Sequence, residues 1–465
     1  MQRKDDKQKL LEKNEFKLRK GQIDELTKIL KKNDGIAPEL YEKYDVKRGL
    51  RDKNGRGVLT GLTDIAEVKS YTIDDNEIVP CEGKLYYRGY DVQELVGGFI
   101  REKRYGFEET TYLLLFGELP NKEELKEFKE LLSYFRSLPT NFVRDVVMKA
   151  PSKDMMNTIA RSVLTLYSYD KKADDISLNN VLRQSLQFIS EIPMLAVYGY
   201  HAYQHYEKGE SLVIHPPKPE LSQAEHILYL LRPDGKYSKL EATTLDLAMV
   251  VHADHGGGNN STFTTRVVTS TGTDSYSAVS AGLAALKGPR HGGANIKVVE
   301  MMNSVKENVK DWEDDEEIEN YLKKIIKKKA FDKRGLIYGV GHAVYTISDP
   351  REVVLKKFVE KLSVEKGMEK EFNLYQKVEK LAPSVIAEAH KSDAETISPN
   401  VDFYSGFIYK MMDIPDELYT PLFACGRISG WCAHRLEELA GGGKIIRPAY
   451  KTIVSHQKYV PVKDR

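Results

Sequence analysis

The sequence predicts an all-α protein with a short β-rich segment near the N-terminus. Three observations support this prediction. From Tyr90 onward, almost every stretch carries apolar residues at the 3.6-residue spacing of a helix. Turn signals rich in Gly, Pro and Asn separate these stretches from one another. Only residues 57–91 combine β-branched and aromatic residues with frequent Gly, Pro and Asp, which is typical of a few short strands.

The first 55 residues differ from the rest of the chain. Residues 2–32 are rich in Lys and Glu, and their Leu, Ile and Phe residues recur at helical spacing. We therefore expect an amphipathic helical arm that packs on the body or on a partner subunit. Acidic residues interleave with the basic ones, which argues against an arm that binds nucleic acid. This start also lacks the apolar core of a signal peptide.

Helical periodicity then fills most of the sequence. Helices are predicted over residues 105–116, 122–137, 154–169, 178–206, 222–231, 237–251 and 275–286. Asp274 is a capping residue at the start of the last of these. The small residues of this last helix predict a buried position. Gly288-Pro289 ends it, and a further helix is expected to begin near Ile296.

Composition excludes several classes of protein. The 465 residues carry 70 Lys and Arg against 69 Asp and Glu, a formal charge of +1, and 41% are hydrophobic. That is too apolar for a disordered chain, and the balanced charge predicts no general attraction to nucleic acid or an anionic membrane. No apolar run approaches the roughly 20 residues that cross a bilayer. Cys81, Cys425 and Cys432 cannot form a disulfide framework, so we expect a cytoplasmic protein.

Two of the 11 histidines stand out, because glycines surround them. His291 lies in GPRHGGAN and His342 in GVGHAVY. Glycines let the backbone approach a ligand closely or hold a tight loop. If His291 caps a helix N-terminus, the helix dipole would keep its ring neutral and able to exchange a proton. The pairs at 201 and 205 and at 252 and 255 lack further ligands, so no metal site is predicted.

One carboxylate and three arginines complete a candidate site. Asp402 lies among apolar and aromatic residues in NVDFYSG, where partial burial would raise its pKa; a helix N-cap is the alternative. Arg427 lies in an otherwise apolar helix, where a buried cation is costly unless it meets an anion. With Arg351 and Arg447 it suggests a site for a small di- or polyanion.

Seven segments, taken in order, resemble citrate synthases of the Si-type and the related 2-methylcitrate synthases. They are LYYRGYD, HADHGGGNNSTFTTR, GPRHGGAN, GVGHAVY, DPR, NVDFYSG, and GRISGWCAH followed by KIIRP. The resemblance implies a large helical domain of residues 56–292 and 412–465 and a small helical domain of residues 293–411. Residues 1–55 would be an N-terminal extension. The active site would lie between the two domains of a homodimer.

The resemblance also implies roles for individual residues. The catalytic residues would be His291, His342 and Asp402. Oxaloacetate would be bound by His255, Arg351 and Arg427 of one chain and by Arg447 of the neighbouring subunit, with Asn259 and Ser261 in support. The adenine of coenzyme A would lie against Leu336, Ile337, Gly339, Val340, Gly341 and Asn400. Neither a metal nor a tightly bound cofactor is implied, because the coenzyme A thioester is a substrate.

The implied activity condenses acetyl-CoA, oxaloacetate and water to citrate and CoA, the entry step of the tricarboxylic acid cycle. Asp402 would take a proton from the acetyl methyl group, His291 would donate to the thioester oxygen, and His342 would polarise the ketone. Two alternatives stay open. A 2-methylcitrate synthase would use propionyl-CoA, since one methylene changes discrimination by only about 1–3 kcal/mol. A non-catalytic CoA-binding protein is the third hypothesis.

The sequence departs from the family pattern at two positions beside site histidines. Gly256 stands where many relatives have Glu, which removes a carboxylate next to His255. Ala343 stands where many bacterial relatives have Arg, so contacts with the phosphates of coenzyme A must come from elsewhere. The N-terminal arm also lacks the β-rich domain of NADH-inhibited relatives, and we expect no NADH site of that kind.

Overall fold

The structure is a computed structural model that describes residues 20–52, 56–74, 77–341 and 344–465. It divides into two compact units, Met1–Thr60 and Gly61–Arg465. In the first unit residues 20–33 are helical, followed by α2 (Pro38–Lys43) and a 3₁₀ turn (Arg48–Leu50). The predicted arm is thus helical from residue 20, and its earlier part lies outside the described residues. Leu26 and Ile29 on this helix are more than half exposed.

The second unit begins with the predicted β-rich segment. Strands β1 (Ala66–Asp74), β2 (Glu77–Tyr87) and β3 (Tyr90–Asp91) form an antiparallel sheet in chain order. Ala66 pairs with Tyr87, and the register shifts between Lys69 and Tyr71. The Tyr87 hydroxyl lies 3.0 and 3.1 Å from the carbonyl oxygens of Val250 and Asp254, and its one proton can be donated to either. This contact ties the sheet to the segment that follows α9.

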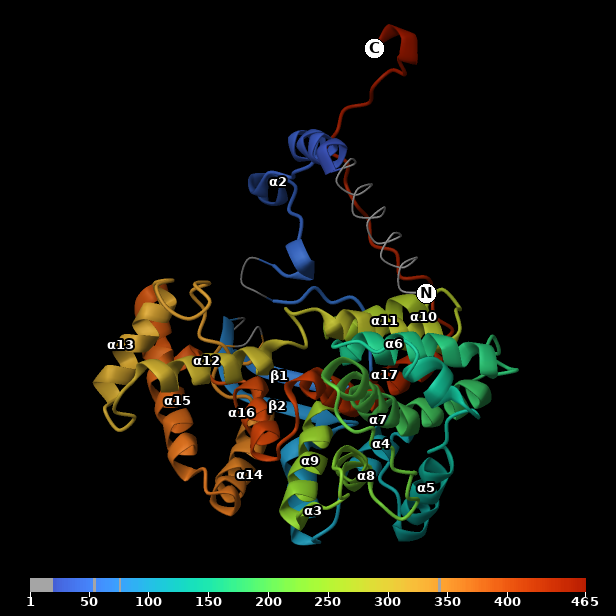
Figure 1. The fold of residues 1–465 in the computed structure, drawn as a ribbon. Coiled ribbons are helices and arrows are strands. Elements are labelled where there is room, and N and C mark those ends of the chain that lie inside the picture. The colour runs from blue at the N-terminus through green and yellow to red at the C-terminus, as the bar shows by residue number, and fades with distance from the viewer. Residues whose placement is uncertain (1–19, 53–55, 75–76, 342–343) are drawn as a thin grey trace, which may run out of the picture. The chain divides into compact units, whose positions relative to one another are not determined.

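The rest of the second unit is helical, as predicted (Figure 1). The α-helices are α3 (Val92–Arg101), α4 (Phe107–Phe116), α5 (Lys122–Tyr134), α6 (Met155–Leu166), α7 (Leu178–Lys208), α8 (Gln223–Leu231), α9 (Lys239–His252), α10 (Asn260–Thr269), α11 (Ser275–Lys287), α12 (Ala294–Asn308), α13 (Asp315–Ile326), α14 (Pro350–Lys366), α15 (Glu369–His390), α16 (Val401–Met411) and α17 (Tyr419–Ala440). Short π or 3₁₀ turns lie at Val143–Val147, Tyr167–Tyr169, Ala394–Thr396, Asp416–Leu418 and Val462–Asp464.

Helix α17 is the centre of the core. Every residue from Tyr419 to Arg435 is buried, and the helix packs against α4, α7, α9 and α10. Its glycines permit these close approaches. A Cβ at Gly426 would lie 2.9 Å from the carbonyl oxygen of Met249, and one at Gly430 would lie 2.4 Å from that of Ala253. Such distances are too short for any side chain, so α9 and α17 can meet only at glycine.

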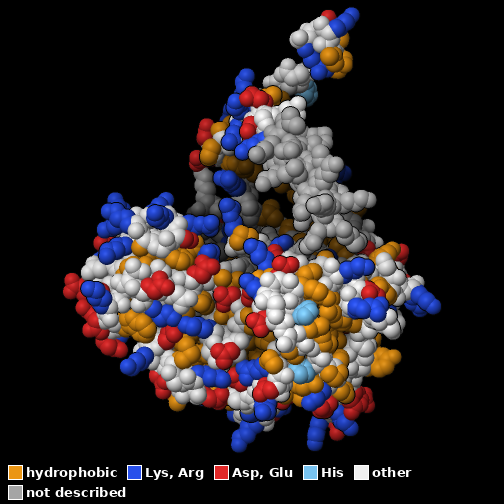
Figure 2. All heavy atoms as spheres, in the orientation of Figure 1, with side chains coloured by type: hydrophobic (Ala, Val, Ile, Leu, Met, Phe, Trp, Pro, Cys, Tyr) orange, Lys and Arg blue, Asp and Glu red, His pale blue; other side chains and the backbone are white. Residues whose placement is uncertain are grey.

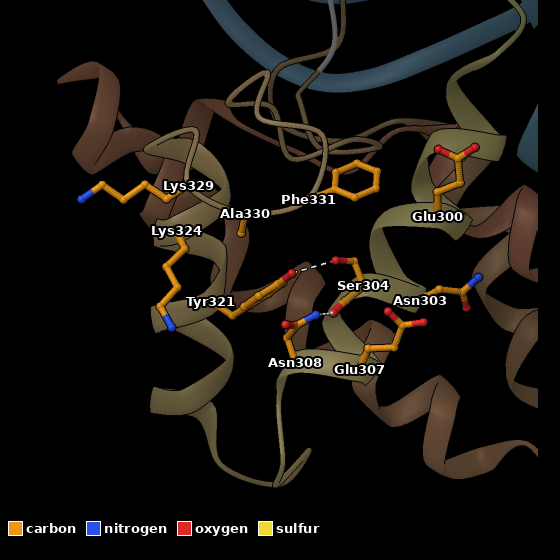
Figure 3. A pocket seen from close by; sticks show the side chains of 10 residues that line it. All are labelled: Glu300, Asn303, Ser304, Glu307, Asn308, Tyr321, Lys324, Lys329, Ala330 and Phe331. Atoms are coloured by element: carbon orange, nitrogen blue, oxygen red, sulfur yellow. Dashed lines mark hydrogen bonds between the residues drawn. The ribbon is translucent and has the colours of Figure 1, made fainter.

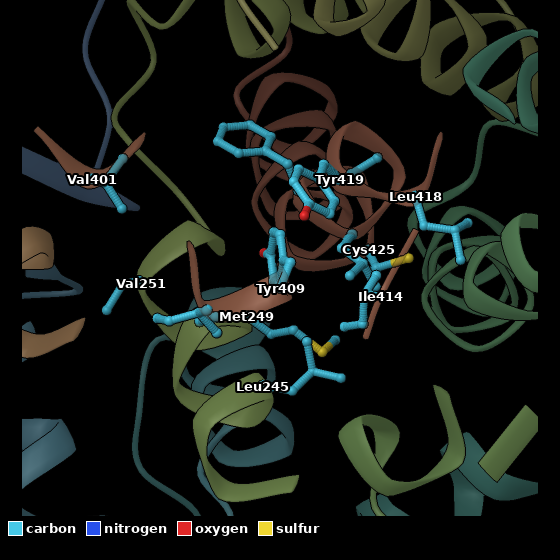
Figure 4. Close-up of a cluster of buried hydrophobic side chains, with 14 of the residues drawn as sticks. Leu245, Met249, Val251, Val401, Tyr409, Ile414, Leu418, Tyr419 and Cys425 are labelled. Carbon is cyan, nitrogen blue, oxygen red and sulfur yellow. The ribbon is translucent and has the colours of Figure 1, made fainter. Parts of the chain in front are cut away.

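Side chains from α9, α16 and α17 fill the core where these helices meet (Figure 4). Leu245 and Met249 come from α9, Tyr409 from α16, and Tyr419 and Cys425 from α17. Cys425 is buried, as expected of a small core residue. This apolar packing fixes the helices that carry the polar residues described below.

Helices α12 to α16 lie together on one side of the second unit (Figure 1). Within this group α13 packs on α15, while α12 and α14 both pack on α16; α14 also contacts α9. A separate small domain of residues 293–411 stays a prediction.

Lys and Arg side chains alternate with Asp and Glu over the face shown in Figure 2. Among the described residues, no helix combines the length and apolarity that a membrane span requires.

Candidate active site

Arg427 presents an unsatisfied guanidinium group inside the protein. Its side chain is fully buried on α17, and Nε donates to the carbonyl oxygen of His252 at 2.6 Å. Nη1 and Nη2 have no hydrogen-bond partner among the described residues. Burial lowers the pKa of Arg427 to about 10, although the negative charge of Asp254 opposes this. A buried cation with two unused donors is a receptor for an anion.

Arg351 is also buried, but it already has a partner. It is the second residue of α14, and its Nε and Nη2 donate to the two oxygens of Asp349, at 2.9 and 2.7 Å. Asp349 also caps α14 by accepting the Arg351 N–H. Burial works to lower the pKa of Arg351, but the Asp349 carboxylate raises it above its ordinary value. Arg351 therefore stays charged beside the site.

Asp402 lies in the first turn of α16, and it is not the cap of that helix. The N-cap is Asn400, whose Oδ1 accepts the Asp402 N–H at 3.0 Å, so the alternative reading as a capping residue was wrong. Burial raises the pKa of Asp402 to about 6, while the charges of Arg351 and Arg427 oppose the rise. A carboxylate with this pKa is a usable base near neutral pH.

His291 is held by a hydroxyl rather than by a helix terminus. It lies in the turn before α12, whose N-cap is Gly293, so the condition considered from the sequence, that His291 caps a helix, is not met. Its Nε2 is 3.0 Å from the Oγ of Ser261. Burial, with the charge of Arg427, lowers the pKa of His291 to about 4. The ring is therefore neutral near pH 7, for a different reason from the one expected.

The Ser261 hydroxyl has three partners. It donates to the Oδ1 of Asn259 at 3.0 Å, accepts from the Nε1 of Trp431 at 3.2 Å, and faces His291. Ser261 lies in the first turn of α10, whose N-cap is Asn259. The structure thus brings Asn259, Ser261 and His291 together, and Trp431 is a member of this group that the sequence did not reveal.

His255 lies on the segment between α9 and α10. Its ring meets that of Tyr345 edge-on, with centroids 5.5 Å apart. The preceding residue, Asp254, is fully buried and accepts the Gly256 N–H at 2.9 Å. Gly256 has φ +77°, a left-handed conformation that disfavours other residues. Sequence reasoning had not assigned Asp254, although HADH placed it beside His255.

The backbone before His342 is tied to the start of α16; His342 itself lies outside the described residues. The Gly341 N–H donates to the Ser398 carbonyl oxygen at 2.7 Å, and the Asn400 Nδ2 donates to the Gly341 carbonyl oxygen at 2.9 Å. The Asn400 N–H donates to the Gly339 carbonyl oxygen at 2.9 Å. Val340 forms a bridge with Pro399. Nearby, Ile337 is buried and Leu336 is exposed.

Arg447 is not brought to the other arginines within this chain. It lies on the exposed segment that follows α17, next to Ile446, whose N–H donates to the Ser270 Oγ at 3.0 Å. Among the described residues of this chain, Arg447 makes no hydrogen bond or ion pair. A role for Arg447 in the site of a neighbouring subunit stays a prediction.

A separate hollow of about 660 Å³ lies between α12, α13 and the segment that follows α13 (Figure 3). Glu300 and Glu307 line one side and Lys324 and Lys329 the other, with a Ser304–Tyr321 hydrogen bond of 2.7 Å at the wall. None of the predicted site residues lines it. The convergent arginines, His291 and Asp402 therefore mark the candidate site better than this hollow does.

A helical body that encloses two arginines, a neutral histidine and a carboxyl of raised pKa holds the groups that an enzyme acting on a small anion needs. The family model described as citrate synthase, C-terminal domain, matches residues 54–449. A citrate synthase of Haloferax volcanii is 34% identical over 427 residues, which are 90% of this chain and 99% of that protein. The chain therefore belongs to the citrate synthase family.

Two further comparisons fit this membership. A 2-methylcitrate synthase of Shewanella oneidensis is 30% identical over 382 residues, which are 82% of this chain and 92% of that protein. The ternary complex of carboxymethyl coenzyme A and oxaloacetate with citrate synthase from Thermoplasma acidophilum has a TM-score of 0.73 and 28% identity, and the match covers 90% of this chain and 99% of that one. All-α citrate synthases are thus the structural neighbours, as predicted.

Proposed function

We propose that the protein condenses acetyl-CoA with oxaloacetate and water to give citrate and CoA, the entry step of the tricarboxylic acid cycle. One observation carries the proposal within the structure. Burial raises the pKa of the base candidate Asp402 to about 6, and the positive charges of Arg351 and Arg427 act in the opposite direction. A carboxylate base beside a receptor for anions is what the deprotonation of one substrate next to a bound dianion requires.

Oxaloacetate would be held through its two carboxylates. Arg427 has the unpaired donors Nη1 and Nη2. Arg351 is close enough for its positive charge to lower the pKa of Arg427. Guanidinium groups bind carboxylates through paired hydrogen bonds, which fix the orientation as well as the charge. His255 would add a further contact. Arg447 would come from the second chain of a homodimer, and its exposed segment leaves it available for this.

Carbon–carbon bond formation needs an acid and a base at the acetyl group. Asp402 would remove a methyl proton while His291 gives a proton to the thioester oxygen, and such catalysis contributes roughly 10²–10⁴-fold for each group. His291 can donate from Nδ1 if its Nε2 accepts the Ser261 proton. That requires the amide of Asn259 to donate to Ser261 instead of accepting from it. Asn259 and Ser261 would therefore set the His291 tautomer.

The remaining steps need groups that stabilise charge and exclude water. His342 would polarise the ketone of oxaloacetate and stabilise the developing alkoxide. The backbone from Leu336 to Gly341, with Asn400, would hold the adenine of coenzyme A, which enters as a substrate thioester rather than as a resident cofactor. Closure of a small domain, residues 293–411, would keep water out until the citryl thioester is hydrolysed.

We propose that the protein acts in the cytoplasm.

The second candidate function is 2-methylcitrate synthesis from propionyl-CoA. The Shewanella oneidensis relative favours it, because that protein is named a 2-methylcitrate synthase. The two activities differ by one methylene in the acyl group, which is worth about 1–3 kcal/mol of discrimination. The ratio of kcat/KM for the two thioesters decides between them.

A thiol-release assay tests the proposal. Purified protein receives acetyl-CoA or propionyl-CoA, each with and without oxaloacetate, and free CoA is followed by a thiol reagent. We expect release that depends on oxaloacetate and a higher kcat/KM for acetyl-CoA. Asp402→Asn should abolish turnover while oxaloacetate binding, followed by calorimetry, is largely kept; exposed Asp413→Asn is the matched control. A protein that binds CoA but releases no thiol with either substrate would be a non-catalytic binding protein.

A further inference from the structure

The buried ring of Tyr345 contacts two of the residues assigned to oxaloacetate. It meets the His255 ring edge-on, with 5.5 Å between the centroids and 78° between the planes. The guanidinium carbon of Arg351 lies over the same Tyr345 ring, 5.6 Å from its centroid. His255 comes from the segment between α9 and α10, and Arg351 comes from α14. One aromatic side chain therefore joins two parts of the site that are far apart in the sequence.

Tyr345 and Asp349 hold Arg351 in different ways. Asp349 accepts from Nε and Nη2 of Arg351, and both bonds lie along the edge of the guanidinium group. The Tyr345 ring attracts the cation electrostatically through its electron-rich face, and burial of both groups strengthens this attraction. Neither contact uses the Nη1 of Arg351. Together they orient the guanidinium group without occupying that donor.

Strand β2 restricts the position of the segment that carries Tyr345. The Gly83 N–H of β2 donates to the Oγ of Ser348 at 3.2 Å. A Cβ at Gly83 would lie 2.0 Å from the Ser348 carbonyl oxygen and 2.6 Å from Cδ1 of Tyr345. Only glycine at position 83 permits this close approach. The Tyr345 ring is therefore packed against the backbone of β2 as well as against the two residues of the site.

We propose that Tyr345 is a positioning residue for oxaloacetate, because the face and edge of its ring orient His255 and Arg351. Groups that are oriented before the substrate arrives lose less freedom on binding, so the affinity for the substrate rises. The inference rests on the proposed function, since it takes oxaloacetate as the anion that these two residues bind. Tyr345 itself needs no contact with the substrate, and the effect concerns oxaloacetate rather than acetyl-CoA.

Tyr345→Leu and Tyr345→Phe test the role of the ring. The leucine variant stays apolar but lacks an aromatic face, so the Kd and KM for oxaloacetate should rise about tenfold. Its kcat and its KM for acetyl-CoA should stay within about twofold of wild type. Tyr345→Phe keeps the ring and should bind oxaloacetate almost as wild type does. Binding by a folded Tyr345→Leu that equals that of wild type would overturn the proposal.

Phe358→Leu is the matched control. Phe358 is a buried aromatic residue on α14, the helix of Arg351, and the Nζ of Lys361 lies over its ring at 5.3 Å. The substitution removes the same kind of contact from the same helix without touching an assigned ligand. The Kd for oxaloacetate should therefore stay within about twofold of wild type.

A series of fluorinated phenylalanines at position 345 decides the question if Tyr345→Leu does not fold. Each fluorine weakens the negative charge of the ring face and changes its size little, so the oxaloacetate KM should rise with the number of fluorines. The same series at Phe358 should leave this KM constant. A wild type that does not bind oxaloacetate would overturn the proposed function and the inference with it. A wild type that binds, with a constant KM across the series at position 345, would overturn the inference alone.

Discussion

The carboxylate of Asp349 accepts the backbone N–H of Val401 at 3.1 Å and thereby joins the first turns of α14 and α16. The same carboxylate caps α14 and pairs with Arg351. Asp402 is the next residue along α16. One buried side chain therefore fixes the relative position of an anion-binding arginine and the base candidate, although the two are 51 positions apart in the sequence.

Asp349→Asn should destabilise the protein strongly. The substitution keeps the size of the side chain but leaves the Arg351 cation buried without its countercharge, which typically costs about 3–5 kcal/mol. Urea unfolding measures the difference in free energy of unfolding. The matched control is Asp145→Asn, which removes an exposed pair with Arg144 and should leave the free energy of unfolding unchanged within the error of the measurement. Equal effects of the two substitutions would show that Asp349 does not hold Arg351.

The activity should fall in acid as Asp402 becomes protonated. Only the carboxylate can accept the methyl proton, so kcat/KM should decline below about pH 6, the pKa of Asp402. His291, with a pKa lowered to about 4, stays neutral across this range and does not shape the decline. A profile between pH 5 and 9 checks this, and constant kcat/KM down to pH 5 would contradict the assignment.

The same pKa has an opposite consequence for stability. Because the folded state raises the pKa of Asp402 above its ordinary value, the folded protein binds this proton more tightly than the unfolded chain does. The contribution of Asp402 to stability is therefore greatest below pH 4 and is lost as the pH rises through about 6. In Asp402→Asn this part of the pH dependence of unfolding should disappear.

Mixed dimers should reveal whether Arg447 acts in a neighbouring site. Arg447→Ala and Asp402→Asn chains should each be inactive alone. A heterodimer would contain one site with both native residues, so mixing should restore up to about half of the activity per intact dimer. Chains with different affinity tags allow the heterodimer to be isolated and assayed. An inactive heterodimer after verified exchange would place Arg447 outside the neighbouring site.

Gly430→Ala should disrupt the contact between α17 and the segment carrying Asp254. The added Cβ would lie 2.4 Å from both the Ala253 carbonyl oxygen and the Asp254 Oδ1. We expect a loss of at least about 1–3 kcal/mol from overpacking, measured by thermal unfolding. Gly98→Ala is the control, because Gly98 lies within α3 with open space around its Cβ position, and it should be neutral or slightly stabilising.

The sequence predicted those elements whose ends are decided locally. Helix α5 begins at Lys122 after a capping box of Asn121 and Glu124, and α11 begins at Ser275 after the predicted cap Asp274. Helix α4 instead begins at Phe107, two residues later than predicted. The carboxylate of Asp246 on α9 accepts the N–H groups of Gly106 and Phe107, at 2.7 and 3.2 Å. Because Asp246 lies 140 positions from Gly106, the sequence around residue 106 does not show where α4 begins.

The candidate site shows the same limit. Buried arginines in apolar or helix-start sequence are unusual enough to be noticed, so Arg351 and Arg427 could be selected from the sequence. The residue that pairs with Arg351 could not be selected in the same way, because in the sequence Asp349 looks like an ordinary helix cap. The sequence suggests a neutral His291 only on the condition that it caps a helix, whereas its pKa is lowered mainly by burial, which only the folded chain defines.

The enclosure of α17 on every side has a consequence for motion. Because its residues are buried from Tyr419 to Arg435, we expect this helix to exchange its amide hydrogens among the slowest in the protein. Arg427 is thus part of the most persistent framework of the molecule. Any rearrangement that admits or releases a ligand must be made by other segments, moving around a guanidinium group that stays still.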